Sequence, residues 1–136
     1  MFLSLLNRKE KLKFLDLAIY MIDIDGAPNE IEKRLLSLMM AELGSDVCDE
    51  YSFQKSLPIE ETIEFFGNSN QVVKNICFLN LVKITMTDDL YNTSEHLFLE
   101  LLQDKFDISF DKRRDLMSII YQERDLREKA RRVINN

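Results

Sequence analysis

The sequence predicts an all-α protein, a single compact bundle of about six to seven helices, and its composition supports this class. Glycine and proline together make only five of the 136 residues, where an average protein has roughly 12% of the two types. Sandwiches, barrels and hairpin proteins need a turn signal about every 8–12 residues, so this shortage excludes them. Hydrophobic residues make 46% of the chain and charged residues 31%, which is typical of one globular domain. We therefore expect residues 1–136 to form a single domain.

The first helix is predicted over residues 8–24. Asn7, followed three residues later by Glu10, is a pattern typical of a capped helix start, and apolar residues recur behind it at helical spacing. Gly26 and Pro28 match the glycine that commonly ends a helix and the proline that often follows it.

The second helix is predicted to begin after Asn29, with Glu32 at its third position, and to reach Gly44. Its expected buried stripe consists of Ile31, Leu35, Leu38 and Met39. A polar stretch follows, in which residues 47–53 are predicted to form a short helix.

The third helix is predicted to start at Pro58 and to end at Gly67, and Ser69 is expected to cap a fourth over residues 70–87. Apolar side chains occupy nearly all sides of the fourth helix, which predicts that it is the central, buried one. Its last part, residues 82–87, alternates apolar and polar residues and resembles a strand when considered in isolation. The internal repeat described below favours a helix there.

The fifth helix is predicted over residues 93–105, and the sixth is expected to begin near Ser109 or Asp111. Apolar residues become sparse after Tyr121. We therefore expect the end of the last helix to project from the body.

Three further observations concern location. The longest uncharged stretches, residues 65–73 and 75–82, have nine and eight residues, far fewer than the ~20 that a membrane-spanning helix needs. Residues 1–6 are too short for a signal-peptide core and are expected to pack on the domain. Cys48 and Cys77 are the only cysteines and lack the spacing of a zinc site or a disulfide framework. We interpret them as reduced thiols, with Cys77 in the core, of a cytoplasmic protein.

The net charge of −6 is unevenly distributed. Residues 1–15 carry four positive charges and one negative charge, a net charge of +3. Residues 16–110 carry six positive and 18 negative charges, a net charge of −12. Residues 111–136 carry eight positive and five negative charges, a net charge of +3. Nucleic-acid binding depends on neutralising phosphates, so an acidic body argues against a nucleic-acid partner. The basic residues of the last helix alternate with acidic ones, as on a solvated face.

An internal repeat appears when the sequence is shifted by 63 residues. The shift places Asp25 on Asp88 and Glu32 on Glu95, and it also aligns the apolar helix before each of these pairs. Each half, about 8–44 and 70–105, is thus a helix, an acidic elbow, an Asn-x-x-Glu cap and a second helix. Two such hairpins, related by a pseudo-twofold axis, would pack into one domain.

The elbow motif resembles that of the tellurite-resistance TerB-like family. Its mark is an Asp-Gly elbow with a glutamate seven residues after the aspartate, as in Asp25-Gly26 and Glu32. The second half has Asp88-Asp89 and Glu95, so that Asp89 replaces the glycine. The resemblance covers roughly residues 8–110. It implies a bacterial, all-helical, pseudo-symmetric domain whose acidic elbows bind a metal ion.

The candidate metal ligands are Asp25, Glu32, Asp88 and Glu95. Hard cations such as Ca²⁺ and Mg²⁺ require several oxygen ligands, which these carboxylates would supply if the two elbows lie together. The structural alternative is that Glu32 and Glu95 only cap their helices, where a carboxylate at the third position is favoured. An EF-hand is excluded because Met21 stands at the first ligand position.

No catalytic constellation is visible. His96 is the only histidine and is expected at a surface or boundary position, and no glycine-rich phosphate loop occurs. The leading hypothesis is a non-enzymatic TerB-like module that binds a divalent cation or a cationic ligand and is linked to a tellurite or stress response. The alternative is a helical adaptor that binds a protein partner and uses the acidic motif residues only as caps. The sequence pattern sets no oligomeric state.

Overall fold

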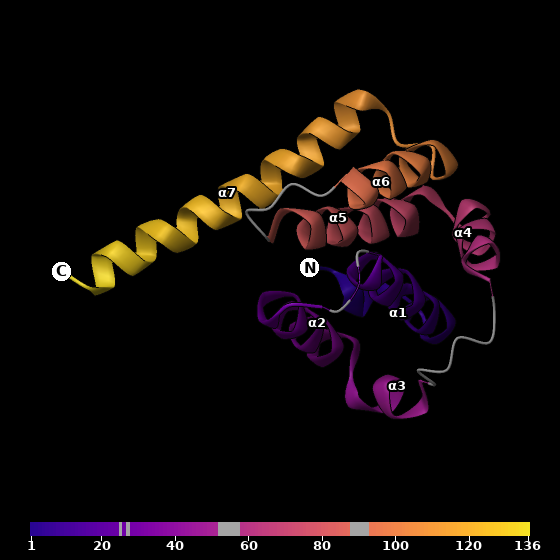
Figure 1. Ribbon diagram of the computed structural model, residues 1–136, viewed down its shortest axis with the longest axis horizontal. Helices are drawn as coiled ribbons and strands as arrows, with labels where there is room; N and C mark the ends of the chain where they lie inside the picture. Colours follow the sequence, from indigo (N-terminus) through magenta and orange to yellow (C-terminus); the bar gives the residue numbers. More distant parts are fainter. Residues whose placement is uncertain (25, 27, 52–57, 88–92) are drawn as a thin grey trace.

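The computed structural model describes residues 1–24, 26, 28–51, 58–87 and 93–136. Within these ranges the regular elements are all helices, so the all-α prediction is confirmed (Figure 1). A short 3₁₀ segment, η1 (Leu3–Leu5), is followed by seven α-helices: α1 (Arg8–Asp23), α2 (Glu30–Leu43), α3 (Ser45–Glu50), α4 (Ile59–Gly67), α5 (Gln71–Thr87), α6 (Thr93–Lys105) and α7 (Phe110–Ile134). In the part of the chain that the structure describes, none of these helices combines the length and the apolar character needed to cross a bilayer.

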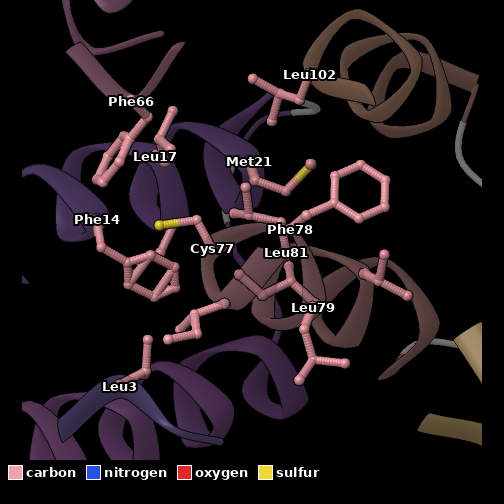
Figure 2. Close-up of a cluster of buried hydrophobic side chains, with 14 of the residues drawn as sticks. Leu3, Phe14, Leu17, Met21, Phe66, Cys77, Phe78, Leu79, Leu81 and Leu102 are labelled. Carbon is pink, nitrogen blue, oxygen red and sulfur yellow. The ribbon is translucent and has the colours of Figure 1, made fainter. Parts of the chain in front are cut away.

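Helix α5 lies at the centre of the bundle and contacts α1, α2, α4, α6 and α7 (Figure 1). Its side chains are buried on almost every side, which confirms the position predicted from its apolar sequence. Figure 2 shows Cys77, Phe78 and Leu81 of α5 among Phe14 and Met21 of α1. Burial of Cys77 in this cluster confirms that it belongs to the core. Residues 82–87 continue the helix, as the repeat predicted.

Asparagine side chains cap the helices α1, α2 and α5. Asn7 and Asn29 each form a full capping box with the glutamate three residues later, as the sequence predicted. The predicted cap of α5 was wrong by one residue. Asn70 Oδ1 accepts the Val73 N–H at 2.9 Å, whereas the Ser69 hydroxyl donates to the Phe65 carbonyl of the preceding helix.

The buried stripe of α2 differs from the predicted one. Leu35 and Met39 are buried as expected, but Ile31 is 51% exposed and Leu38 62% exposed. The buried side instead includes Glu32. Apolar residues occupy more of the surface of α2 than the neighbouring elements can bury. The periodicity therefore identified Leu35 and Met39 correctly, but it was wrong for Ile31 and Leu38.

The N-terminal segment packs on the body, as predicted, through buried Leu3 and Leu6. The Met1 ammonium group forms an ion pair with Glu42 at 3.0 Å and donates to Asn80 Oδ1 at 2.8 Å. The side-chain amide of Asn80 donates in return to the Met1 carbonyl at 2.8 Å. These contacts tie the segment to α2 and to the centre of α5.

The last helix has two different halves. The first half of α7 packs on α5 through buried Leu116 and Ile120. Its second half extends beyond the body, as the thinning of apolar residues predicted (Figure 1). All residues from Arg124 to Asn136 are exposed.

Candidate functional site

Glu32 occupies the third position of α2, where it belongs to a capping box. Its Oε1 accepts the Asn29 N–H at 3.1 Å, and its own N–H donates to Asn29 Oδ1 at 2.8 Å. The side chain is nevertheless only 8% exposed, which is unusual for a glutamate. The capping role proposed as the structural alternative is therefore present at this residue.

The second carboxylate oxygen of Glu32 is not used by the cap. Within the described part of the chain, Oε2 accepts no hydrogen bond and forms no ion pair. The same residues contain no fully buried side-chain oxygen or nitrogen that lacks a partner. Oε2 therefore still meets solvent at the edge of the core.

Glu95 has the matching place in the second half. It is the third residue of α6 and is also 8% exposed. Buried glutamates are rare, and here two of them stand 63 residues apart at the same helical position. The two candidate ligands that the structure describes thus share both their helix position and their burial.

The elbow aspartates Asp25 and Asp88 lie outside the described residues, as does Asp89. Gly26 is described and has a φ of +117°, and its N–H donates to the Asp23 carbonyl at 3.0 Å. That φ favours glycine, which explains why the first elbow carries one. Considering only the described residues, no three His, Cys, Asp or Glu side chains are grouped so as to hold a metal ion. The four-carboxylate site therefore stays a prediction.

The cysteine thiols are poorly suited to act as nucleophiles. Burial raises the pKa of Cys77, and burial together with Asp49 and Asp46 raises the pKa of Cys48. A raised pKa keeps a thiol protonated at neutral pH, whereas the thiolate is the reactive form.

His96 lies in the first turn of α6 and is partly exposed, at the boundary position that the sequence predicted. Its Nε2 is 3.0 Å from Glu100 Oε1, and the same oxygen is 3.9 Å from Arg113 Nη1. Arg113 also donates to the buried Gln103 at 2.6 Å. These groups connect α6 with α7.

Two surface hollows were not foreseen from the sequence. One, of about 520 Å³, brings the two helix-capping residues Asn7 and Asn70 to the same place and includes Leu5 and Val72. The other, of about 420 Å³, lies along the outer side of α7 beside Phe110, Met117 and Tyr121. Their apolar residues are separated in sequence by polar ones, so only the packed helices show which of them remain exposed.

A scan against protein-family models gives no match, and neither the curated proteins nor the solved structures give a significant one.

Proposed function

We propose that the chain is a non-enzymatic, TerB-like helical module whose acidic elbows bind a divalent cation or another cationic ligand in a tellurite or stress response. The burial of Glu32 and Glu95 at equivalent helix positions is the observation that carries this proposal. Each glutamate adjoins an elbow that supplies a further aspartate, Asp25 or Asp88. Carboxylate oxygens are the ligands that Ca²⁺ and Mg²⁺ prefer.

The pseudo-twofold repeat that the proposal assumes is supported by the helix bounds. Adding 63 to the bounds of α1 gives 71–86, and α5 spans Gln71–Thr87. The same shift moves α2 to 93–106, and α6 spans Thr93–Lys105. The burial pattern of the second helices agrees as well: Glu32, Leu35, Met39 and Leu43 are buried, and so are Glu95, Phe98, Leu102 and Phe106.

The open oxygen of Glu32 supports ligand binding beyond capping. A cap uses one carboxylate oxygen, and a glutamine provides the same acceptor without the charge. The cation hypothesis therefore depends on the negative charge, whereas the capping hypothesis depends only on the hydrogen bond. This difference separates the two roles experimentally.

Thermal unfolding with added Ca²⁺, Mg²⁺, Mn²⁺ or Zn²⁺ tests the proposal. A cation that binds only the folded state stabilises it by about 2.7 kcal/mol at 100 times its dissociation constant, which raises the midpoint. We expect the double variant Glu32→Gln with Glu95→Gln to lose this shift while it keeps the stability of the ion-free protein. Glu64→Gln, which changes an exposed glutamate of α4, is the matched control and should respond like the wild type.

Two results would contradict the cation proposal. One is a midpoint that no ion moves at millimolar concentration, and the other is a shift that the double variant retains in full. Either result would leave the two glutamates with a capping role.

The second candidate function is the protein-binding adaptor, which the surface of α7 favours. Large exposed apolar side chains are concentrated on this helix: Phe110, Ile119, Tyr121, Leu126, Val133 and Ile134. Exposed apolar surface that gathers on one element is typical of a binding face. A pull-down in which truncation after Tyr121 abolishes binding of a protein partner would support this function, and binding that survives the truncation would contradict it.

A further inference from the structure

Two polar side chains, Glu42 of α2 and Asn80 of α5, form a cradle around the first residue of the N-terminal segment. The Met1 ammonium nitrogen lies 3.0 Å from Glu42 Oε2 and 2.8 Å from Asn80 Oδ1. The Leu3 N–H donates to the other carboxylate oxygen of Glu42, Oε1, at 2.9 Å. Both oxygens of Glu42 therefore bind the same segment, residues 1–6, which we call the strap.

Asn80 forms the buried side of this cradle, since its side chain is only 1% exposed. Its amide nitrogen donates to the carbonyl oxygens of Met1 and Ile76, each at 2.8 Å. Among the described residues, Met1 provides the one donor that reaches its Oδ1. Water has little access to so buried a side chain, so the ammonium group is needed to satisfy this oxygen.

A free amine and an acylated amine differ in how they can fill the cradle. An ammonium group carries several N–H donors and a positive charge, so it can serve Glu42 and Asn80 together. Acylation converts it into an amide, which has a single N–H and no charge. One of the two acceptors then loses its donor, and the partly buried carboxylate of Glu42 loses its counter-charge. A peptide bond to a preceding residue has the same effect.

The strap contains a residue whose conformation depends on these contacts. Phe2 has a φ of 60°, in the left-handed region that a residue with a large side chain seldom adopts. Its own ring is 59% exposed and gives little support. The residues on either side are bound, Met1 through its amine and Leu3 through its N–H and its buried side chain. Loss of the amine contacts therefore weakens one of the two supports of this conformation.

We propose that Glu42 and Asn80 form a binding site for the free α-amino group of Met1, and that acylation of this amine, or a residue placed before it, releases the strap. Polar groups that capture an N-terminal amine are a recurring mode of chain-end recognition. Release exposes the side chains of Leu3 and Leu6, which are 0% and 3% exposed in the closed strap. The amine of Met1 is thus a modification site that controls access to the core surface under the strap.

Hydrogen exchange of the Leu3 amide tests the proposal, because its bond to Glu42 exists while the strap is closed. The full chain with a free Met1 amine is compared with the same chain acetylated at Met1 and with a chain that has one glycine before Met1. Both altered chains should exchange the Leu3 amide about tenfold faster or more, as the loss of a charge-assisted hydrogen bond implies.

A cradle without its carboxylate separates recognition of the ammonium group from the size of the acetyl group. Glu42→Gln removes the negative charge that pairs with Met1, so acetylation should accelerate exchange much less in this background. Glu64→Gln, which changes an exposed glutamate of α4, is the matched control. Acetylation should keep its full effect in the control.

Three results would overturn the proposal. The first is a Leu3 amide that exchanges equally fast in the free and the acetylated chain, and the second is a glycine-extended chain that keeps full protection. Either would show that the apolar contacts of Leu3 and Leu6 hold the strap without the amine. The third is an effect of acetylation that Glu42→Gln leaves unchanged, which would show that the acetyl group acts through its size.

Discussion

The hairpins α1–α2 and α5–α6 have nearly the same helix lengths but different surroundings. Helix α1 is buried on one side and carries exposed or partly exposed lysines, such as Lys9 and Lys13, on another. Helix α5 is surrounded by five helices and is buried almost throughout. A shared pattern of caps and elbows therefore determines where the helices begin and end, whereas the neighbouring helices determine how many sides of each helix are buried.

The segments that follow the two hairpins differ from each other even more. After α2, the chain reaches α4, which packs on α1 through Ile63 and Phe66. The positions 63 residues later are Leu126 and Lys129, in the exposed half of α7. Residues 124–136 are all exposed, so no buried pair of this kind holds the second half of α7 to the body, and it extends outward (Figure 1).

The largest expected effect comes from truncating equivalent core residues of the two hairpins. Leu43 is the last residue of α2 and Phe106 directly follows α6, and both are almost fully buried. Leu43→Ala should lower the free energy of unfolding by about 2–5 kcal/mol and Phe106→Ala by about 3–5 kcal/mol. Both should lower the same cooperative transition in urea, followed by circular dichroism. Separate transitions for the two variants would contradict a single domain.

A smaller loss of stability is expected at a position where the equivalent helices α1 and α5 carry chemically different buried residues. Buried Asn80 of α5 stands where α1 has buried Leu17. Asn80→Leu should destabilise the protein by about 1–3 kcal/mol, because the Met1 carbonyl and ammonium groups lose hydrogen-bond partners. Urea denaturation measures this loss. An unchanged or higher stability would show that apolar packing compensates for those bonds.

The capping asparagines of α1 and α2 should contribute less to the stability of the protein, and each by about the same amount. Asn7→Ala and Asn29→Ala each remove the side chain that begins a capping box, and each should cost about 1 kcal/mol. Thermal unfolding of both variants measures the two costs on one scale. A clearly larger cost for Asn29→Ala would mean that the buried Glu32 relies on its cap for more than starting the helix.

The smallest expected effect on stability comes from the contact between Tyr51 and Asp16 in the first half of the chain. Burial and the hydrogen bond that its hydroxyl donates to Asp16 raise the pKa of Tyr51. Because the folded state holds the proton more tightly, this contribution is complete below the unfolded pKa of about 10 and is lost as the pH rises above it. Midpoints measured from pH 8 to 11 should fall more steeply for the wild type than for Tyr51→Phe, and parallel profiles would contradict this.

The sequence predicts most helix bounds because the residues that cap or end a helix stand next to its ends in the chain. Asn7, Gly26, Asn29, Gly44 and Gly67 all stand at or beside helix ends. The exposed faces were harder to predict. Ile31 and Leu38 have the right spacing for a core stripe, yet the neighbouring helices cover the side that contains Glu32 instead. Periodicity gives the angle between side chains, whereas tertiary packing selects the side that is buried.

The candidate site could be predicted only in part, because its capping pattern is local in sequence whereas its burial depends on tertiary packing. The Asn-x-x-Glu pattern identified Glu32 and Glu95 because capping chemistry is local in sequence. Their burial depends on long-range packing, so it could not be predicted from the pattern. The exposed apolar side chains of α7 were missed as a feature because they also fit a core-facing series that starts with Leu116.

Diffraction from crystals grown with Mn²⁺ tests whether Glu32 and Glu95 bind a cation, because the anomalous signal locates the ion itself. We expect a bound Mn²⁺ within about 2.0–2.6 Å of a carboxylate oxygen of Glu32 or Glu95, the range for hard cations and oxygen ligands. We also expect the elbow aspartates to complete the ligand set. An ordered protein with no ion beside either glutamate, in crystals saturated with Mn²⁺, would contradict the claim and reduce both residues to helix caps.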